Sequence, residues 1–359
     1  MKSKTRVLAA MSGGVDSSVA AYLLKSADYE LIGAMMKLYE SGGDENFSHR
    51  SCCTLSDAED AESVANCIGI PFYMFNFTDV FRETVIKRFI SAYRRGFTPN
   101  PCIDCNRFLK FERFFTRAEE LECDKIATGH YARIEKDVNG RYLLKKGVDG
   151  SKDQSYFLYA MTQKQLSGTL FPLGDLTKEN VRGIADEQGF VNAEKRDSQD
   201  ICFAPDGDYA GFIERFTAEP IKKGRFVNKD GATLGEHKGL INYTIGQRKG
   251  LGLFNPEPLY VLGLDPTENT VTLGVSEDLF SDELTARDIN FIPFDKIDGS
   301  LRVRAKIRYA HNPAPVTIWQ TDKDTVCMRF DEPQRAITPG QAVVLYDGDI
   351  VIGGGTIEG

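Results

Sequence analysis

Residues 11–18 read Met-Ser-Gly-Gly-Val-Asp-Ser-Ser, and this stretch indicates the fold of the first part of the chain. It joins a β-type run at Val7–Ala10 to a helical run at Val19–Lys25. A glycine-rich turn from a strand into a helix gathers free backbone N–H groups at the positive end of the helix dipole, which favours a bound phosphate. Gly13 and Gly14 let the backbone approach a ligand closely, because neither has a Cβ atom. The stretch lacks the lysine of the Walker loop, so we expect a nucleotide-binding loop of another kind.

Strand and helix patterns alternate from this loop to about residue 208. We expect strands at Arg6–Ala10, Leu31–Leu38, Phe72–Phe77 and Lys125–Thr128. Helical patterns cover Ser17–Lys25, Ser56–Ile68, Val80–Phe89, Phe108–Glu120 and Lys178–Gln188. This alternation predicts an α/β domain with a Rossmann-like parallel sheet and helices on both faces. Ligands of such sheets bind at the carboxyl ends of the strands, where residues 11–18 lie.

The sequence after about Tyr209 is typical of small β domains. Glycine and proline separate short apolar runs at Gly239–Ile245, Leu259–Leu264, Thr270–Gly274, Val316–Gln320, Thr325–Phe330 and Ala342–Tyr346. A chain of 359 residues is also too long for one compact core. We therefore predict an α/β domain at residues 1–208, a central β domain at 209–284 and a C-terminal β-barrel-like domain at 285–359.

The composition is that of an ordinary soluble globular protein, with 42% hydrophobic and 27% charged residues. Met1–Lys4 leads directly into a strand without the apolar core of a signal peptide, and no apolar run is long enough to span a membrane. We expect a cytoplasmic protein without a membrane partner, in which the eight cysteines are reduced thiols.

Basic residues are concentrated in two segments, although the net charge of the chain is −8. The first segment, residues 87–117, has two acidic residues against eight basic ones, which are Lys87, Arg88, Arg94, Arg95, Arg107, Lys110, Arg113 and Arg117. In the second, Arg302–Tyr309, basic residues alternate with mostly apolar ones, which on a strand places four cations on one face. A solvated face is the usual meaning of such runs, but we expect phosphate contacts here. The acidic segments Asp57–Glu62 and Asp278–Glu283 are then expected on surfaces away from these phosphate contacts.

Cysteines suggest a second kind of chemistry. Cys102 and Cys105 lie in Thr-Pro-Asn-Pro-Cys-Ile-Asp-Cys-Asn (98–106), where two prolines predict a rigid loop before a helix at Arg107–Glu120. Thiols beside Arg107 and a helix N-terminus should ionise readily, as a nucleophile or a metal ligand must. Cys202 is a third candidate, in a polar stretch.

Three hypotheses stay open for Cys102, Cys105 and Cys202: a zinc or redox site, a three-cysteine iron–sulfur cluster, and thiol chemistry between one loop cysteine and Cys202. The other cysteines carry weaker signals. We expect Cys67, Cys123 and Cys327 in the core, and only a weak metal signal from Cys52 and Cys53 near His49.

Six motifs in a fixed order carry a family resemblance that covers nearly the whole chain. They are the loop at 11–18, Pro-Asn-Pro-x-x-x-Cys-Asn (99–106), Ala-Thr-Gly-His-Tyr-Ala-Arg (127–133), Lys-Asp-Gln-Ser-Tyr-Phe-Leu (152–158), Asp-Ser-Gln-Asp-Ile-Cys-Phe (197–203) and Tyr-Thr-Ile-Gly-Gln-Arg-Lys-Gly-Leu-Gly (243–252). Together they resemble the tRNA-specific 2-thiouridylases, N-type ATP pyrophosphatases of the PP-loop superfamily. The resemblance implies an ATP-pyrophosphatase domain followed by two small β domains.

The implied activity is that of a tRNA-uridine 2-sulfurtransferase, which adenylates the C2 oxygen of the wobble uridine (position 34) with ATP and Mg²⁺ and then adds sulfur. The implied partners are a tRNA with a wobble uridine and a sulfur-donor protein or sulfide source. A PP-loop ligase of small molecules is an alternative, but the paired thiols and the basic segments disfavour it.

Site residues follow from the resemblance by motif position. Cys105 matches the nucleophile and Cys202 the persulfide carrier, with a Cys105–Cys202 disulfide formed in the cycle. The implied nucleotide site is Met11, Ser12, Gly13, Gly14, Val15, Asp16, Ser17, Ser18, Met36 and Gly129, with Asp16 helping to hold Mg²⁺ on pyrophosphate. The implied tRNA contacts are Asn100, Pro101, Cys102, His130, Lys152, Asp153, Gln154, Arg308, Tyr309 and Gln341. Many relatives have aspartate in place of Cys102, so an iron–sulfur cluster held by Cys102, Cys105 and Cys202 stays an alternative to the persulfide.

Overall fold

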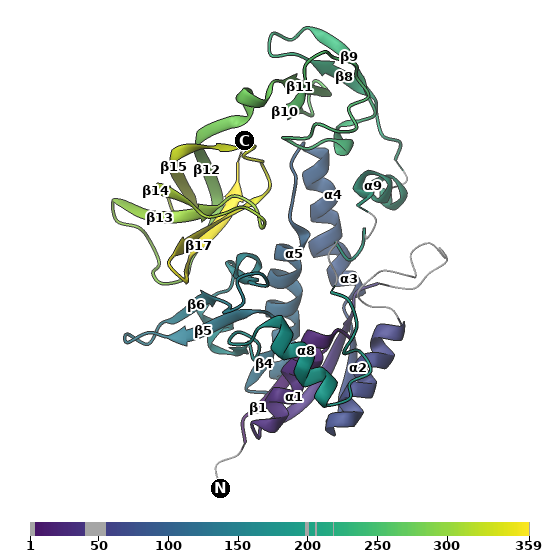
Figure 1. Cartoon of the computed structure of the whole chain (residues 1–359), viewed down its shortest axis with the longest axis vertical. Coiled ribbons are helices and arrows are strands. Elements are labelled where there is room, and N and C mark those ends of the chain that lie inside the picture. The colour runs from purple at the N-terminus through teal and green to yellow at the C-terminus, as the bar shows by residue number, and fades with distance from the viewer. Residues whose placement is uncertain (1–3, 40–54, 198–200, 205–206, 218, 359) are drawn as a thin grey trace. The chain divides into compact units, whose positions relative to one another are not determined.

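The computed structural model describes residues 4–39, 55–197, 201–204, 207–217 and 219–358 (Figure 1). Two compact units make up the chain. The first consists of Met1–Val85, Cys102–Asp206 and Asp349–Val351, and the second of Ile86–Pro101, Gly207–Gly348 and Ile352–Gly359.

A five-stranded parallel sheet forms the centre of the first unit, in the order β3-β2-β1-β4-β7. Its strands are β1 (Arg6–Ala10), β2 (Glu30–Lys37), β3 (Phe72–Asn76), β4 (Lys125–Ala127) and β7 (Thr169–Leu170). The strand order reverses at β1, so the carboxyl ends of β1 and β4 flank the switch point at which ligands of such sheets bind. The predicted Rossmann-like domain is confirmed.

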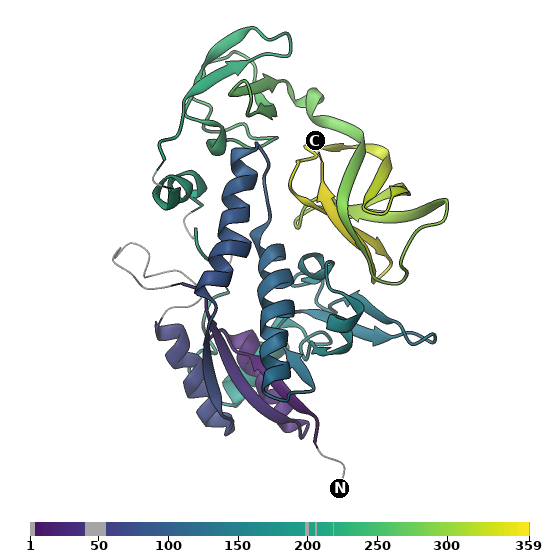
Figure 2. The same cartoon turned by 180° about the vertical axis from the view of Figure 1, so that it is seen from behind.

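Helices cover both faces of this sheet (Figures 1 and 2). On one face α1 (Val15–Ser26) packs against α2 (Leu55–Ile68) and α8 (Lys178–Glu187) through a shared apolar cluster. The other face carries α6 (Phe114–Glu120), which contacts β4. A hairpin that the sequence did not predict, β5 (Ala132–Lys136) and β6 (Tyr142–Lys146), follows β4 and pairs with the start of β17 (Ile350–Ile357).

One sequence prediction about the cysteines is wrong. Cys102 and Cys105 do not lie on an irregular loop, because α5 (Pro101–Asp104) begins at the second proline and continues as the π-helical η3 (Cys105–Arg113) into α6. Proline is tolerated at the first helical position, where its fixed φ suits the helix and its missing N–H would have no partner anyway. A similar series, α3 (Thr78–Phe81), η2 (Arg82–Ile86) and α4 (Lys87–Arg94), extends the helix expected at Val80–Phe89.

The second unit contains α9 (Tyr209–Thr217), a small sheet and a closed barrel. The sheet has the order β10-β11-β8-β9, with β8 at Gly224–Val227, β9 at Thr233–His237, β10 at Tyr260–Asp265 and β11 at Thr270–Gly274. The short run at Gly239–Ile245, one of those that indicated β structure, contains a 3₁₀ turn, η5 (Leu240–Asn242), which follows Gly239 at φ 121°.

The barrel consists of β12 (Phe280–Phe291), β15 (Thr325–Arg335), β14 (Ala314–Asp322), β13 (Ser300–Lys306), β16 (Ala342–Asp347) and β17. Pairing of β12 with β17 closes the ring and leaves no free edge between them. The β architecture after residue 208 is therefore confirmed, while the boundaries at 208/209 and 284/285 stay predictions. Within the described residues, none of the helices is long and apolar enough to cross a bilayer.

Candidate active site

The loop at residues 11–18 connects β1 to α1 at the carboxyl edge of the sheet. Gly14 is the N-cap residue of α1 and, as a glycine, has no side chain with which to cap this end. The first-turn N–H groups of α1 therefore remain available to an anion. Two serines act within the loop: Ser17 Oγ accepts from Ser12 N at 3.1 Å and donates to Gly14 O at 2.9 Å.

Lys178 supplies the cation that the loop itself lacks. It is the first residue of α8, and its Nζ lies 2.8 and 2.9 Å from the two carboxylate oxygens of Asp16 and 2.7 Å from Asp197 Oδ1. The Lys178 side chain is only 11% exposed, so the ion pairs are shielded from water. Tyr131 donates to Asp16 Oδ1 at 2.7 Å. Sequence reasoning missed Lys178, whose only local signal is its position at the start of an expected helix.

The electrostatics of this cluster follow from burial and pairing. Burial, reinforced by the Asp16 carboxylate, raises the pKa of Tyr131, which therefore stays a neutral donor. Burial also raises the pKa of Asp197, but hydrogen bonds from Lys152 and Lys178 outweigh it and leave that pKa below its usual value. Asp197 is thus held charged beside Lys178.

A second lysine cluster supports the opposite side of the loop. Lys195 Nζ lies 2.6 Å from Asp57 Oδ1, 2.6 Å from Asp60 Oδ2 and 3.2 Å from Gly13 O. Asn192 donates to Gly13 O at 3.0 Å. The expectation that the acidic segment Asp57–Glu62 lies on a remote surface is wrong for Asp57, which is buried at this loop.

Gly13 and Gly129 are required by close backbone contacts on the two sides of the loop. Gly13 has φ 76°, and a Cβ there would lie 2.2 Å from Asp57 O. A Cβ on Gly129 would lie 2.8 Å from Asp16 C and Ser17 N. Gly129 therefore lies against the nucleotide loop, as its predicted role requires.

We expect Gly129→Ala to weaken ATP binding by at least about tenfold, because the methyl group must push the backbone of Asp16 and Ser17 out of place. The measurement is ATP affinity by calorimetry, together with the thermal midpoint. Gly150→Ala is the matched control, since nothing lies within 4 Å of a Cβ at that position. Equal ATP affinity in the two variants would contradict the packing argument.

His130 occupies a buried aromatic environment. Its Nδ1 lies 2.7 Å from Thr128 Oγ1, and its ring centroid is 6.0 Å from that of Phe111 and 5.8 Å from that of Phe171. Burial, followed by the charge of Lys110, lowers its pKa well below the usual value, so the imidazole is neutral. These contacts favour a structural role, and the tRNA contact of His130 stays a prediction.

The predicted sulfur residues lie in two parts of the first unit. Cys105 begins η3, and Asn106 beside it donates to Phe157 O at 3.1 Å. Cys202 Sγ lies 2.9 Å from the hydroxyl of Tyr39, two residues beyond the end of β2. Because β2 neighbours β1, Cys202 lies near the same edge of the sheet as the nucleotide loop.

Of the three candidate cysteines, Cys102 is exposed, and Cys105 and Cys202 are partly buried. Among the described residues, no three His, Cys, Asp or Glu side chains gather as they would around a metal ion. Cys123 is buried as predicted and Cys327 partly so, but Cys67 is exposed, so that prediction is wrong. His49, Cys52, Cys53 and residues 198–200 of the fifth motif lie outside the described residues.

Lys152, Asp153 and Gln154 form a turn close to the lysine cluster. Lys152 pairs with Asp197 at 2.8 Å, Asp153 Oδ1 accepts from Gly147 N at 3.1 Å, and Gln154 Oε1 accepts from Tyr131 N at 3.1 Å. These bonds order the turn. Met36 lies on β2, partly buried and opposite Phe75 of β3.

In the second unit, the predicted tRNA residues lie on the barrel and on the segment before α5. Gln341 Nε2 donates to Thr98 O at 2.9 Å, two residues before Asn100. Arg308 donates to Arg335 O at 3.3 Å, and the exposed Tyr309 ring lies 5.3 Å from Lys306 Nζ. Exposed and buried residues alternate along β13 as predicted, but this strand ends at Lys306 and does not include Arg308.

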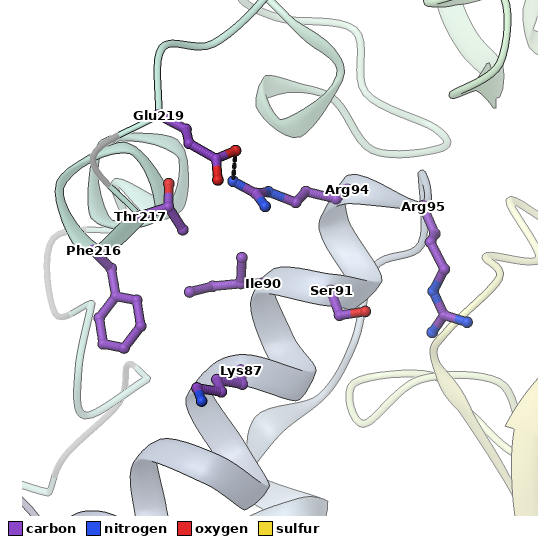
Figure 3. Close-up of a pocket in the computed structure, with 8 residues that line it drawn as sticks. All are labelled: Lys87, Ile90, Ser91, Arg94, Arg95, Phe216, Thr217 and Glu219. Atoms are coloured by element: carbon purple, nitrogen blue, oxygen red, sulfur yellow. Dashed lines mark hydrogen bonds and ion pairs between the residues drawn. The ribbon is translucent and has the colours of Figure 1, made fainter.

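An open groove of about 440 Å³ lies between α4 and the end of α9, within the second unit (Figure 3). Its lining residues are Lys87, Ile90, Ser91, Arg94, Arg95, Phe216, Thr217 and Glu219. Arg94 forms an ion pair with Glu219 at 2.6 Å. The segment Lys87–Arg95 contains four cations and no acidic residue, so the groove is basic apart from Glu219.

Comparisons with known proteins match the whole chain. Three family models cover it in succession: a "tRNA methyl transferase HUP domain" at residues 5–206, a "tRNA methyl transferase PRC-barrel domain" at 210–275 and an "Aminomethyltransferase beta-barrel domain" at 281–357. A tRNA-specific 2-thiouridylase MnmA from Clostridioides difficile is 54% identical over 354 residues, which is 98% of each chain. Proteins of the same name from Acetivibrio thermocellus and Clostridium acetobutylicum are 52% and 50% identical, over 99% and 98% of this chain and 100% and 99% of theirs.

Proposed function

This chain belongs to the tRNA-specific 2-thiouridylase family, and from that premise we propose that it adenylates the C2 oxygen of a wobble uridine and replaces it with sulfur carried by Cys202. The observation that carries the proposal is the PP-type loop at 11–18, held between two lysine–carboxylate clusters at the carboxyl edge of the sheet. Uridine C2–O is a poor leaving group until AMP is attached to it, so an ATP-dependent step has to come first.

In the adenylation step, the uridine oxygen attacks the α-phosphorus of ATP and pyrophosphate leaves. The free N–H groups at the start of α1 and the ammonium group of Lys178 are placed to stabilise the charge that develops on the phosphates. Asp16 fits a Mg²⁺ ion, which usually takes one or two carboxylates together with substrate phosphates and water. Bound there, Mg²⁺ would neutralise charge on the pyrophosphate.

In the sulfur step, the Cys105 thiolate attacks Sγ of the Cys202 persulfide, and the terminal sulfur leaves as hydrosulfide. Hydrosulfide then adds to C2 of the adenylated uridine, and AMP leaves. The products are 2-thiouridine and a Cys105–Cys202 disulfide, which an external thiol must reduce before the next cycle. Partial exposure of both sulfurs supports this route, because each has to meet a partner from solution.

The defining experiment incubates the protein with ATP, Mg²⁺, a sulfide or persulfide source and unmodified tRNA, and measures AMP and thiolated nucleoside. We expect both products in equal amounts. AMP without thiolation would favour a small-molecule ligase, and absence of ATP turnover would favour a protein that only binds RNA. Anaerobically purified protein is also analysed for iron and labile sulfide. If both are present and Cys102→Asp removes them, the mechanism uses an iron–sulfur cluster at Cys102, Cys105 and Cys202 in place of the persulfide.

We assign the groove between α4 and α9 to the phosphate backbone of tRNA. Its cations and its open shape support this assignment. Replacing Lys87 and Arg94 together by glutamine should lower tRNA affinity roughly tenfold at about 0.15 M salt, and should reduce the slope of log K against log salt by about 1 to 2. Glu219→Gln should act in the opposite direction and strengthen binding a few-fold, because it releases Arg94 from its ion pair.

The control for this pair of variants is Lys296→Gln, which removes one cation from an exposed ion pair with Asp298 in the same unit. Filter binding over a salt series measures all of these changes. If the groove variants and the control show the same affinity and slope, the groove does not bind tRNA.

A further inference from the structure

The surroundings of Cys202 contain a residue to which no role has yet been given. Tyr39 lies just beyond β2, and its hydroxyl oxygen is 2.9 Å from Cys202 Sγ. This is a short contact between residues 163 positions apart, so the tertiary fold and not local chain geometry creates it. Its length indicates a direct hydrogen bond.

The aromatic rings around Tyr39 hold this contact in place. The ring of Tyr39 meets that of Phe81 edge to face at 5.1 Å, and Phe81 in turn meets Phe203 at 5.9 Å. Phe81 and Phe203 are almost completely buried. Because Phe203 directly follows Cys202, the three rings fix both the hydroxyl and the backbone that carries the sulfur.

The ring contacts of Tyr39, Phe81 and Phe203 also connect the two sulfur residues. Phe81 belongs to α3, and α3 packs against η3, the segment that begins with Cys105. A hydroxyl fixed by Phe81 is therefore anchored to the element that carries the proposed nucleophile.

We propose that Tyr39 is a positioning residue that donates its hydroxyl proton to Cys202 Sγ and stabilises the thiolate form in the loading step. This inference rests on the proposed function of Cys202. A thiol can donate or accept this bond, but a thiolate can only accept it, so the bond strengthens when Cys202 loses its proton.

Stabilising the thiolate affects the rate of loading, the step in which Cys202 takes up sulfur from a donor. The Cys202 thiolate attacks the outer sulfur of a donor persulfide, R–S–SH; the Cys202 Sγ–S bond forms, the donor S–S bond breaks and the donor leaves as a thiol. One sulfane sulfur moves and no net oxidation occurs. The rate follows the thiolate fraction of Cys202, which Tyr39 increases at neutral pH.

The test is Tyr39→Phe, which removes the hydroxyl and keeps the ring that packs on Phe81. Alkylation of Cys202 by iodoacetamide is followed against pH by mass spectrometry of the peptide that contains it, so that the other thiols do not interfere. We expect the rate at pH 7 to fall about 3- to 10-fold and the midpoint of the profile to move to higher pH. Persulfide loading should fall by a similar factor, with ATP-dependent adenylation unchanged.

Recovery at high pH separates this role from a structural one. Once Cys202 is fully ionised, the variant and the parent should alkylate at equal rates, whereas a distorted site would stay slow. Tyr29→Phe is the matched control, since it removes a hydroxyl from a partly buried tyrosine of the same unit and should leave the profile unchanged.

The inference is overturned if the alkylation profiles of the parent and Tyr39→Phe superimpose, or if the lower alkylation rate of Tyr39→Phe persists at high pH. Failure of the proposed function gives a different result. In that case Cys202→Ala would thiolate tRNA normally, whatever the alkylation profile of Tyr39→Phe.

Discussion

Replacing Cys105 or Cys202 by alanine should lower tRNA thiolation by more than about 1000-fold while adenylation of the tRNA continues at close to the parent rate. The reason is the proposed division of the reaction between two sites: the loop at 11–18 and Lys178 would act on ATP, and the thiols would act only on the activated base. The measurement is single-turnover formation of labelled AMP-tRNA and of thiolated nucleoside, made on the same samples.

The control is Cys67→Ala, because Cys67 is an exposed free thiol of the same unit that lies on α2, outside the proposed sulfur site. It should retain full activity in both steps. Loss of adenylation in the Cys105 and Cys202 variants would contradict the division of labour, and normal thiolation by either variant would remove that cysteine from the mechanism.

Lys178→Met should lower the rate of adenylation by about 100- to 1000-fold, the range found when one preorganised donor to a developing charge is removed. In the structure the ammonium group lies 2.7–2.9 Å from the carboxylates of Asp16 and Asp197, and its removal leaves these two partly buried carboxylates without their shared cation. We therefore expect a lower thermal midpoint as well, because two carboxylates lose the cation that pairs with both of them.

A matched comparison is Lys145→Met, which breaks a 2.8 Å ion pair with Glu135 on the surface hairpin. Water screens an exposed pair of this kind, so this variant should resemble the parent in stability and in adenylation. Lys178→Met with parental pyrophosphate release would show that the lysine only holds the fold and takes no part in the chemistry.

Several features could be predicted because they are encoded locally. Short apolar runs alternating with helical patterns located β1 to β4 of the parallel sheet but not the two-residue β7, and the Ser-Gly-Gly stretch at 11–18 located the loop between β1 and α1. Local rules also produced the main error in the predicted fold. The two prolines predict a loop at Cys102 and Cys105, although Pro101 occupies the first helical position, which favours proline.

The sequence by itself determined the α/β domain, the β architecture that follows it, the nucleotide loop and, through its ordered motifs, the family. Only the tertiary structure brought Lys178 to Asp16, Lys195 to Gly13 and Tyr39 to Cys202, over separations of 162 to 182 residues. The physical reason is that hydrophobic periodicity and turn chemistry act over a few residues. The partner of a buried charge or sulfur is chosen instead by the packing of whole elements, here the docking of α8 and of the Cys202 segment at the carboxyl edge of the sheet.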